Sequence, residues 1–124
     1  MLMVETCFPP FAEEWPEAKL DFEGLTGRVL KGPQGLTIFM AADRDVEVPK
    51  HRHGAQWGIV LAGSMELTLG GKTERYGPGQ THYIPADVEH EATLYAGWRG
   101  LYIFDRSSGL RSALEQPHAR VHHG

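Results

Sequence analysis

Three features are scarce in this sequence: cysteine, clusters of basic residues and long apolar runs. Cys7 is the only cysteine among 124 residues, so no intrachain disulfide can form, and we expect a cytoplasmic protein. The formal net charge is −4 and no Lys/Arg cluster forms a basic face, which argues against nucleic-acid binding. The longest apolar run, residues 36–42, is far shorter than the roughly 20 residues of a spanning helix, so we expect no membrane contact.

Glycine and proline, in contrast, are abundant for a chain of this length. The sequence holds 15 Gly and 8 Pro, and it is long enough for one domain with a real core. Both residues punctuate turns, so their abundance favours short strands with tight connections over a helical bundle.

Short apolar segments of strand length recur between these turn residues. Residues 65–69 alternate apolar and polar side chains, and Gly70-Gly71 fits a two-residue hairpin turn that leads into residues 72–76. Nine strands are predicted in all, at residues 26–31, 36–42, 46–48, 57–61, 65–69, 72–76, 81–84, 90–95 and 100–105. This rhythm is typical of an antiparallel all-β sandwich or barrel.

The two ends of the chain differ from this regular centre. Residues 1–24 are interrupted by prolines but rich in aromatics, which predicts an irregular N-terminal arm packed on the barrel or on a partner subunit. The barrel itself is expected over residues 25–106. Residues 107–124 are expected to form a short helix, over 108–116, and a polar tail.

Histidine is the residue type that carries the most information about function. His51 and His53 are separated by one residue on or beside a predicted strand, so both imidazoles can face the same space. Imidazole is the commonest protein ligand for divalent metals, but a site needs more ligands than these two. His90, at the start of another predicted strand, is the natural third candidate.

Two stretches of the sequence resemble the two sequence motifs of the cupin superfamily. Residues 51–63, HRHGAQWGIVLAG, resemble the first motif, and residues 79–90, GQTHYIPADVEH, resemble the second. The resemblance implies a double-stranded β-helix, a small jelly-roll barrel that holds a metal ion inside. The sequence departs from the motifs at three glycine or asparagine positions, where it has Asp45, Asp87 and Leu94.

Carried over residue by residue, the resemblance makes His51, His53 and His90 the metal ligands. The fourth ligand, usually Glu, falls on Gln56, although its spacing from His53 is shorter than in the family. We therefore expect one divalent ion per chain, which could be Zn, Mn, Fe, Ni or Cu, and no organic cofactor. Because the four ligands are neutral, the ion would keep its full charge and favour an anionic ligand.

Four aromatic residues are candidates for the lining of the substrate pocket: Trp57, Tyr83, Tyr102 and Phe104. Strand alternation places Tyr102 and Phe104 on one face, and pockets for small molecules are mostly apolar. Near them, His82 lies outside the ligand set of the motif, so we interpret it as a structural or surface residue.

The function we expect is that of a metal-binding single-domain cupin acting on a small polar or anionic metabolite. The chemistry would be Lewis-acid catalysis of an isomerase- or lyase-like kind, with catalytic residues beyond the ligands unknown. Two alternatives stay open: an Fe-, Cu- or Ni-dependent cupin dioxygenase, and a non-catalytic module that binds a small molecule or a metal. We also expect a homodimer, because one predicted sheet face carries Trp57, Ile59 and Leu61 at the same parity.

Overall fold

Nine strands make up most of the described chain, which in the computed structural model comprises residues 8–105. The strands are β1 (Leu25–Gly32), β2 (Gly35–Ala42), β3 (Val46–His51), β4 (Gln56–Ala62), β5 (Met65–Leu69), β6 (Lys72–Tyr76), β7 (Thr81–Ile84), β8 (His90–Leu94) and β9 (Arg99–Asp105). All nine predicted strands are present, so the all-β prediction is confirmed. The clearest difference is β3, which continues to His51.

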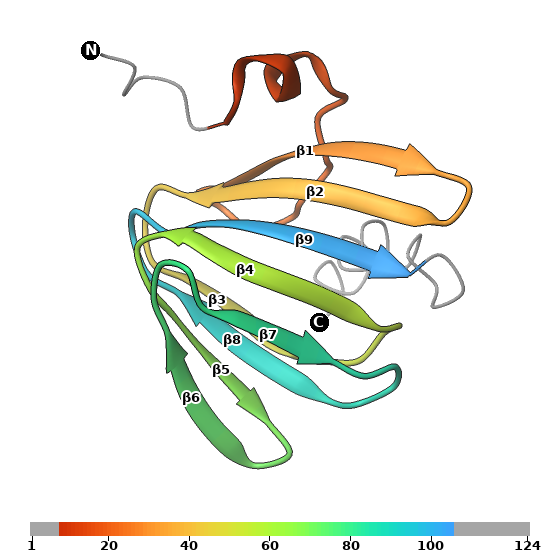
Figure 1. Ribbon diagram of the computed structural model, residues 1–124. Helices are drawn as coiled ribbons and strands as arrows, with labels where there is room; N and C mark the ends of the chain where they lie inside the picture. The colour runs from red at the N-terminus through yellow and green to blue at the C-terminus, as the bar shows by residue number, and fades with distance from the viewer. Residues whose placement is uncertain (1–7, 106–124) are drawn as a thin grey trace.

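The strands form two antiparallel sheets that face each other (Figure 1). One sheet has the order β1-β2-β9-β4-β7, and the other has the order β3-β8-β5-β6. The chain passes from one sheet to the other before and after β3, between β4 and β5, between β6 and β7, and before and after β8. These crossings define a jelly-roll barrel, and they bring the β3–β4 connection next to the start of β8.

The core lies between the two sheets. Alternate side chains of each strand point inward, which gives the buried face of both sheets an almost wholly apolar surface. The largest fully buried side chains are Trp98, Ile38, Met65, Ile84 and Val60. No helix in the described range is long and apolar enough to span a bilayer.

The turn between β5 and β6 has the conformation that the sequence predicts. Gly70 and Gly71 have φ angles of 59° and 80°, in the left-handed region that glycine adopts without a steric penalty. Two successive positive φ angles suit a two-residue hairpin with the natural twist of its strands.

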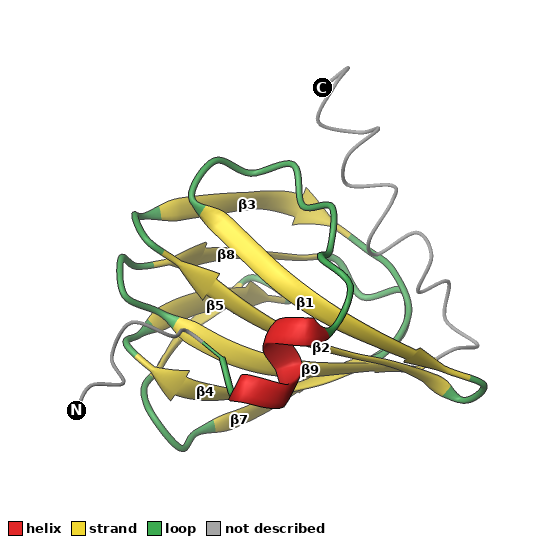
Figure 2. Ribbon diagram, turned by 90° about the horizontal axis from the view of Figure 1, so that it is seen from above, coloured by secondary structure: helices red, strands yellow, loops and turns green. Residues whose placement is uncertain are grey.

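The N-terminal segment packs on the outer face of the five-stranded sheet. A short 3₁₀ helix, η2 (Pro10–Glu14), lies over that sheet (Figure 2). Phe8 and Ala12 form a small cluster with Ala41 of β2, and Trp15 and Phe39 pack against it. The helix and tail predicted after residue 106 lie outside the described residues.

Candidate metal centre

A β-bulge in β3 turns one of the histidines inward. Val48 pairs with Ala92 of β8, but the next registered pair is His51 with His90, so β3 contains one extra residue. Pro49 lies in this interval, where its missing N–H leaves no gap in the ladder. Without the extra residue, strand alternation would point His51 outward. The bulge therefore places His51 directly opposite His90, on the inner face of the sheet.

Three imidazole rings lie close together where the end of β3, the β3–β4 connection and the start of β8 meet. The ring centroids of His51 and His90 are 4.2 Å apart, and that of His53 lies 5.0 Å from His51 and 4.8 Å from His90. One potential ligand nitrogen from each ring lies within 4.8 Å of the others. Among the described residues, no carboxylate or thiol belongs to this group.

The backbone fixes which nitrogen of each ring can bind a metal. In all three histidines Nδ1 lies within hydrogen-bond distance of a main-chain carbonyl oxygen, which can only accept, so Nδ1 carries the proton. The acceptors for His51, His53 and His90 are the carbonyls of Pro49 (2.7 Å), Gly54 (2.8 Å) and Val88 (2.9 Å) respectively. The neutral ring then has its lone pair on Nε2. Such hydrogen bonds orient the metal-binding histidines of proteins.

The donor set fits a divalent transition-metal ion. Three neutral imidazoles whose ligand nitrogens lie within 4.8 Å of one another suit Zn and its neighbours. Burial also favours the neutral form, because it lowers the pKa of His90, an effect that the hydrogen bond with Val88 partly opposes.

The loop before β8 holds His53 in place. The N–H of Asp87 donates to the carbonyl oxygen of His53 at 2.8 Å, and the Arg52 guanidinium reaches the carbonyl of Asp87 at 3.4 Å. Asp87 has a φ of 64°, the only non-glycine residue in the described range with a positive value. Aspartate tolerates this conformation better than most residues. It stands where the second motif has glycine, so the turn is kept although the glycine is not.

Gln56 begins β4, three residues after His53. Its side chain is buried and has the inward parity, and its register partners are Ile84 of β7 and Phe104 of β9. The ring of Phe104 lies 5.5 Å from that of His53, so Gln56 and the histidine cluster share this neighbour. Its amide oxygen is thus a neutral potential metal ligand, buried at the start of β4.

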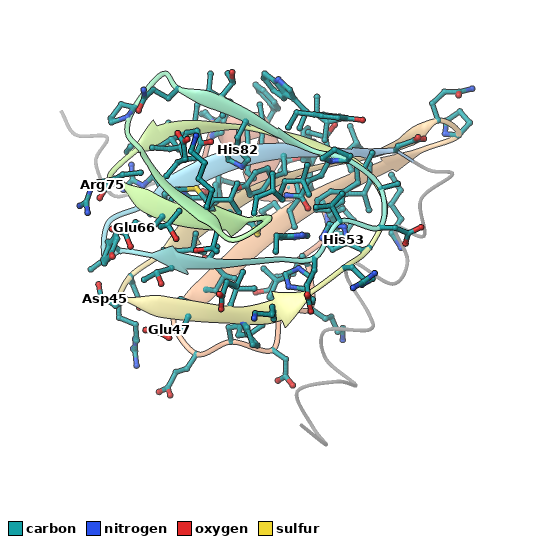
Figure 3. All side chains as sticks on the ribbon, turned by 90° about the horizontal axis from the view of Figure 1, so that it is seen from below. Asp45, Glu47, His53, Glu66, Arg75 and His82 are labelled. Carbon is teal, nitrogen blue, oxygen red and sulfur yellow. The ribbon has the colours of Figure 1, made fainter. Side chains whose placement is uncertain are left out.

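A second polar group lies deeper in the barrel. His82 of β7 is buried, and its Nε2 is 3.1 Å from the hydroxyl of Tyr102, whose oxygen is 3.5 Å from the sulfur of Met65. Burial, with a smaller contribution from His90, lowers the pKa of His82 to about 4, and burial raises the pKa of the Tyr102 phenol. Both groups are therefore neutral near pH 7. Figure 3 shows His82 and His53 well separated along the barrel.

The sequence interpretation left undecided whether His82 is a structural or a surface residue. Strand alternation puts His82 on the same face of β7 as the apolar Ile84, and this was the one sequence signal for its burial. Its contact with Tyr102 depends on strand order, because β7 and β9 are both neighbours of β4. No local pattern in the sequence indicates that pairing.

The four aromatic pocket candidates divide between the two faces of one sheet. Tyr102 and Phe104 are buried inside the barrel, and the ring of Tyr102 packs on Gly58, where any Cβ would collide with it. Trp57 and Tyr83 have the opposite parity and are exposed on the outer face. They border a groove of about 640 Å³ near the β1–β2 hairpin.

The fold and the cluster together define a class: a small jelly-roll barrel with three convergent histidines at one end. Residues 36–94 match the family described as Cupin domain. The chain is therefore a cupin-fold protein that carries a cupin domain, as the two sequence motifs predict. No curated protein matches the sequence.

Solved structures with low sequence identity share this fold. An RmlC-like cupin from Shewanella frigidimarina is 21% identical with a TM-score of 0.68, and the match covers 77% of this chain and 86% of that one. KdgF from Halomonas sp. is 23% identical with a TM-score of 0.58, covering 69% and 87%. The polyketide cyclase RemF from Streptomyces resistomycificus is 20% identical with a TM-score of 0.65, covering 90% and 89%.

Proposed function

We propose that this chain is a metal-dependent cupin enzyme in which His51, His53 and His90 hold one divalent ion and Gln56 is the fourth ligand. The observation that carries the proposal is that three clustered histidines each donate Nδ1–H to a main-chain carbonyl, so that each ring has its lone pair on Nε2. A histidine cluster with a purely structural role would not need the same tautomer three times.

The ligand set points to Lewis-acid chemistry on an anionic metabolite. A bound divalent ion would supply positive charge to polarise a carbonyl or carboxylate, undiminished by any charged ligand. The chain's own residues would shape the surroundings of the ion. Phe104 and Tyr102 would line the interior and exclude water. His82 and Tyr102 are neutral, so they would add no competing charge. An isomerase- or lyase-like reaction of a small carboxylate fits this arrangement. The name of RemF, a polyketide cyclase, is in keeping with such a reaction.

The alternatives are an oxygenase and a binding module. Many iron oxygenases bind the metal through two histidines and a carboxylate, and no carboxylate belongs to the described cluster. That observation favours the Lewis-acid proposal. We also keep the cytoplasm as the proposed location, on the basis of the single cysteine.

Activity of separately reconstituted proteins distinguishes these functions. Metal-free protein would be loaded with Zn, Mn or Fe(II) and incubated with a panel of keto acids, hydroxy acids and unsaturated uronates, with products followed by NMR and oxygen by electrode. We expect the Zn or Mn protein to convert at least one carboxylate under nitrogen, and His51→Ala to abolish the conversion. Turnover only with Fe(II) and oxygen would establish the oxygenase instead. Saturable ligand binding without product from any loaded protein would establish the binding module.

A further inference from the structure

Few charged side chains share the inner face of the barrel. Apart from the histidines, only three charged residues of the described strands have the inward parity of the core, namely Lys31, Lys72 and Glu74. Lys72 and Glu74 lie on β6, and their side chains pair at 3.2 Å. Lys31 lies near the end of β1, and no ion pair within residues 8–105 involves it. Lys31 is therefore the inward charge that the described chain leaves for a ligand to neutralise.

The strand register places Lys31 in the same row as Gln56. Lys31 pairs with Leu36 of β2, which pairs in turn with Phe104 of β9. Phe104 is also the register partner of Gln56 at the start of β4. Figure 1 shows the β1–β2 hairpin, the end of β9 and the start of β4 at one end of the barrel. We call Lys31, Leu36, Phe104 and Gln56 the rim row.

A groove of about 640 Å³ brings the rim row together, because all four of its members line this groove. The ring of Phe104 lies 5.5 Å from that of His53, so the groove reaches the immediate surroundings of the histidine cluster. Its volume is within the range of small-molecule sites, which are mostly apolar and use a few polar groups to orient the ligand. Along the rim row, Lys31 and Gln56 are those polar groups.

The two polar ends of the rim row are separated by an apolar floor. Leu36 and Phe104 lie between them and are both buried. Neighbouring strands are about 4.8 Å apart, so three steps put the Cα atoms of Lys31 and Gln56 roughly 14 Å apart. The long, flexible side chain of lysine shortens this gap. A ligand that bridges the two ends therefore needs a short carbon chain with a polar group at each end.

We propose that Lys31 is a specificity-determining residue that binds the distal carboxylate of a short dicarboxylate, whose other carboxylate is held at the histidine centre. This assignment rests on the proposed function, since the metal ion would bind the first carboxylate. The apolar floor would contact the carbon chain. An analogue with an uncharged far end would leave the Lys31 ammonium without a counter-ion, and sites built for a polar group reject ligands that lack it.

The overall charge of the chain does not favour such a ligand by itself. The formal net charge is −4, so the mean field of the molecule repels a dianion. Local cations must therefore supply the attraction. The metal ion would supply one of them, and Lys31 supplies the other at the opposite end of the rim row.

Calorimetric titration of the zinc-loaded full chain tests the assignment. The probes are three pairs of equal chain length: succinate and butyrate, glutarate and valerate, and adipate and hexanoate. In at least one pair we expect the dicarboxylate to bind about tenfold more tightly or better, because hydrogen bonds to charged groups contribute at least that factor. Lys31→Gln should abolish this preference, and Lys31→Arg, which keeps the charge, should retain a large part of it.

Lys72→Gln is the matched control, because it removes the same charge at another inward position, where the lysine is already paired with Glu74. It should keep the preference. Circular dichroism and zinc content verify that every variant is folded and loaded. Equal affinities within all three pairs, or a preference that persists in Lys31→Gln, would overturn the assignment and leave the metal proposal intact. A wild type that binds no zinc would overturn both.

Discussion

At the scale of single residues, the site depends on how the main chain holds each imidazole. Main-chain carbonyls accept the Nδ1 proton of His51, His53 and His90, which puts the lone pair of each ring on Nε2. The sequence could identify these three residues, because the His-x-His spacing and the second motif are local patterns. It could not predict their tautomers, which depend on carbonyl groups placed by the fold.

The role of Gln56 can be tested by giving the site a charge. Gln56→Glu should raise the affinity of the metal-free protein for Zn by at least about tenfold, since a carboxylate–cation contact is stronger than an amide contact. Gln56→Leu should lower it. Competition titration with a chromogenic chelator measures both. Equal affinities in the wild type and the two variants would show that Gln56 is not a ligand.

Buried His82 makes the stability of the metal-free protein depend on pH. Its pKa is about 4 in the folded chain, against 6.5 for a fully solvated histidine, so between these values the unfolded chain binds more protons. The contribution of neutral His82 to the free energy of unfolding should therefore be fully present above pH 6.5. It should fall by about 3 kcal/mol as the pH drops to 4. His90, whose pKa is also lowered, changes stability in the same direction.

Urea unfolding at pH 7 and pH 4.5 measures this effect. His82→Phe keeps an aromatic ring beside Tyr76 and Tyr102 but removes the titration, so its stability should vary less over the same interval. An equal pH dependence in the wild type and His82→Phe would show that His82 is not the responsible group.

At the scale of elements, two irregular segments build the centre: the β3 bulge and the loop before β8. The strands were predictable from alternation and turn residues, because those signals are local. The bulge was not, since it appears only when β3 is paired with β8. The sequence interpretation placed His51 and His53 on one face through strand alternation alone. The structure places His51 through the bulge and His53 through the loop.

The Asp87 turn should matter more for the site than its exposure suggests. Asp87→Val places a β-branched residue at a φ of 64°, which should cost about 1–2 kcal/mol of stability. It should also weaken Zn binding, because the Asp87 N–H donates to the carbonyl of His53. Asp87→Gly should preserve both properties.

Thermal unfolding and Zn titration check these effects, with Glu89→Val as the control. Glu89 is an exposed residue two positions further on, with an ordinary backbone conformation. If Asp87→Val behaved like Glu89→Val in both measurements, the turn would have no special role.

At the scale of the whole molecule, the two sheets enclose a core that also serves as the wall of the site. The inner face is apolar except for the histidine cluster, Gln56 and the His82–Tyr102 pair. The two motifs predicted the fold over residues 51–94, and the rhythm of strands and turns extended that prediction to the rest of the barrel. Which aromatic side chains point into the barrel was only partly predictable. Strand alternation puts Tyr102 and Ile103 on opposite faces of β9, but the inner face is known only once the two sheets are assembled.

A metal that links β3 and β8 should stabilise the entire barrel. Zn at 100 times its Kd should add about 2.7 kcal/mol to the free energy of unfolding, because the unfolded chain does not gather the three histidines. Differential scanning calorimetry before and after removal of metal with EDTA measures this. His53→Ala should lose most of the difference, whereas Thr73→Glu should keep it. An unchanged melting temperature after complete metal removal would contradict the expectation.

The most direct test of the account is the metal content of the purified, untagged chain by elemental mass spectrometry, measured after incubation with Zn and gel filtration. The three-histidine centre predicts about one ion per chain in the wild type and in His82→Phe, and a large loss in His51→Ala and His90→Ala. A wild type without bound metal, or one whose metal survives both His51→Ala and His90→Ala, would contradict it.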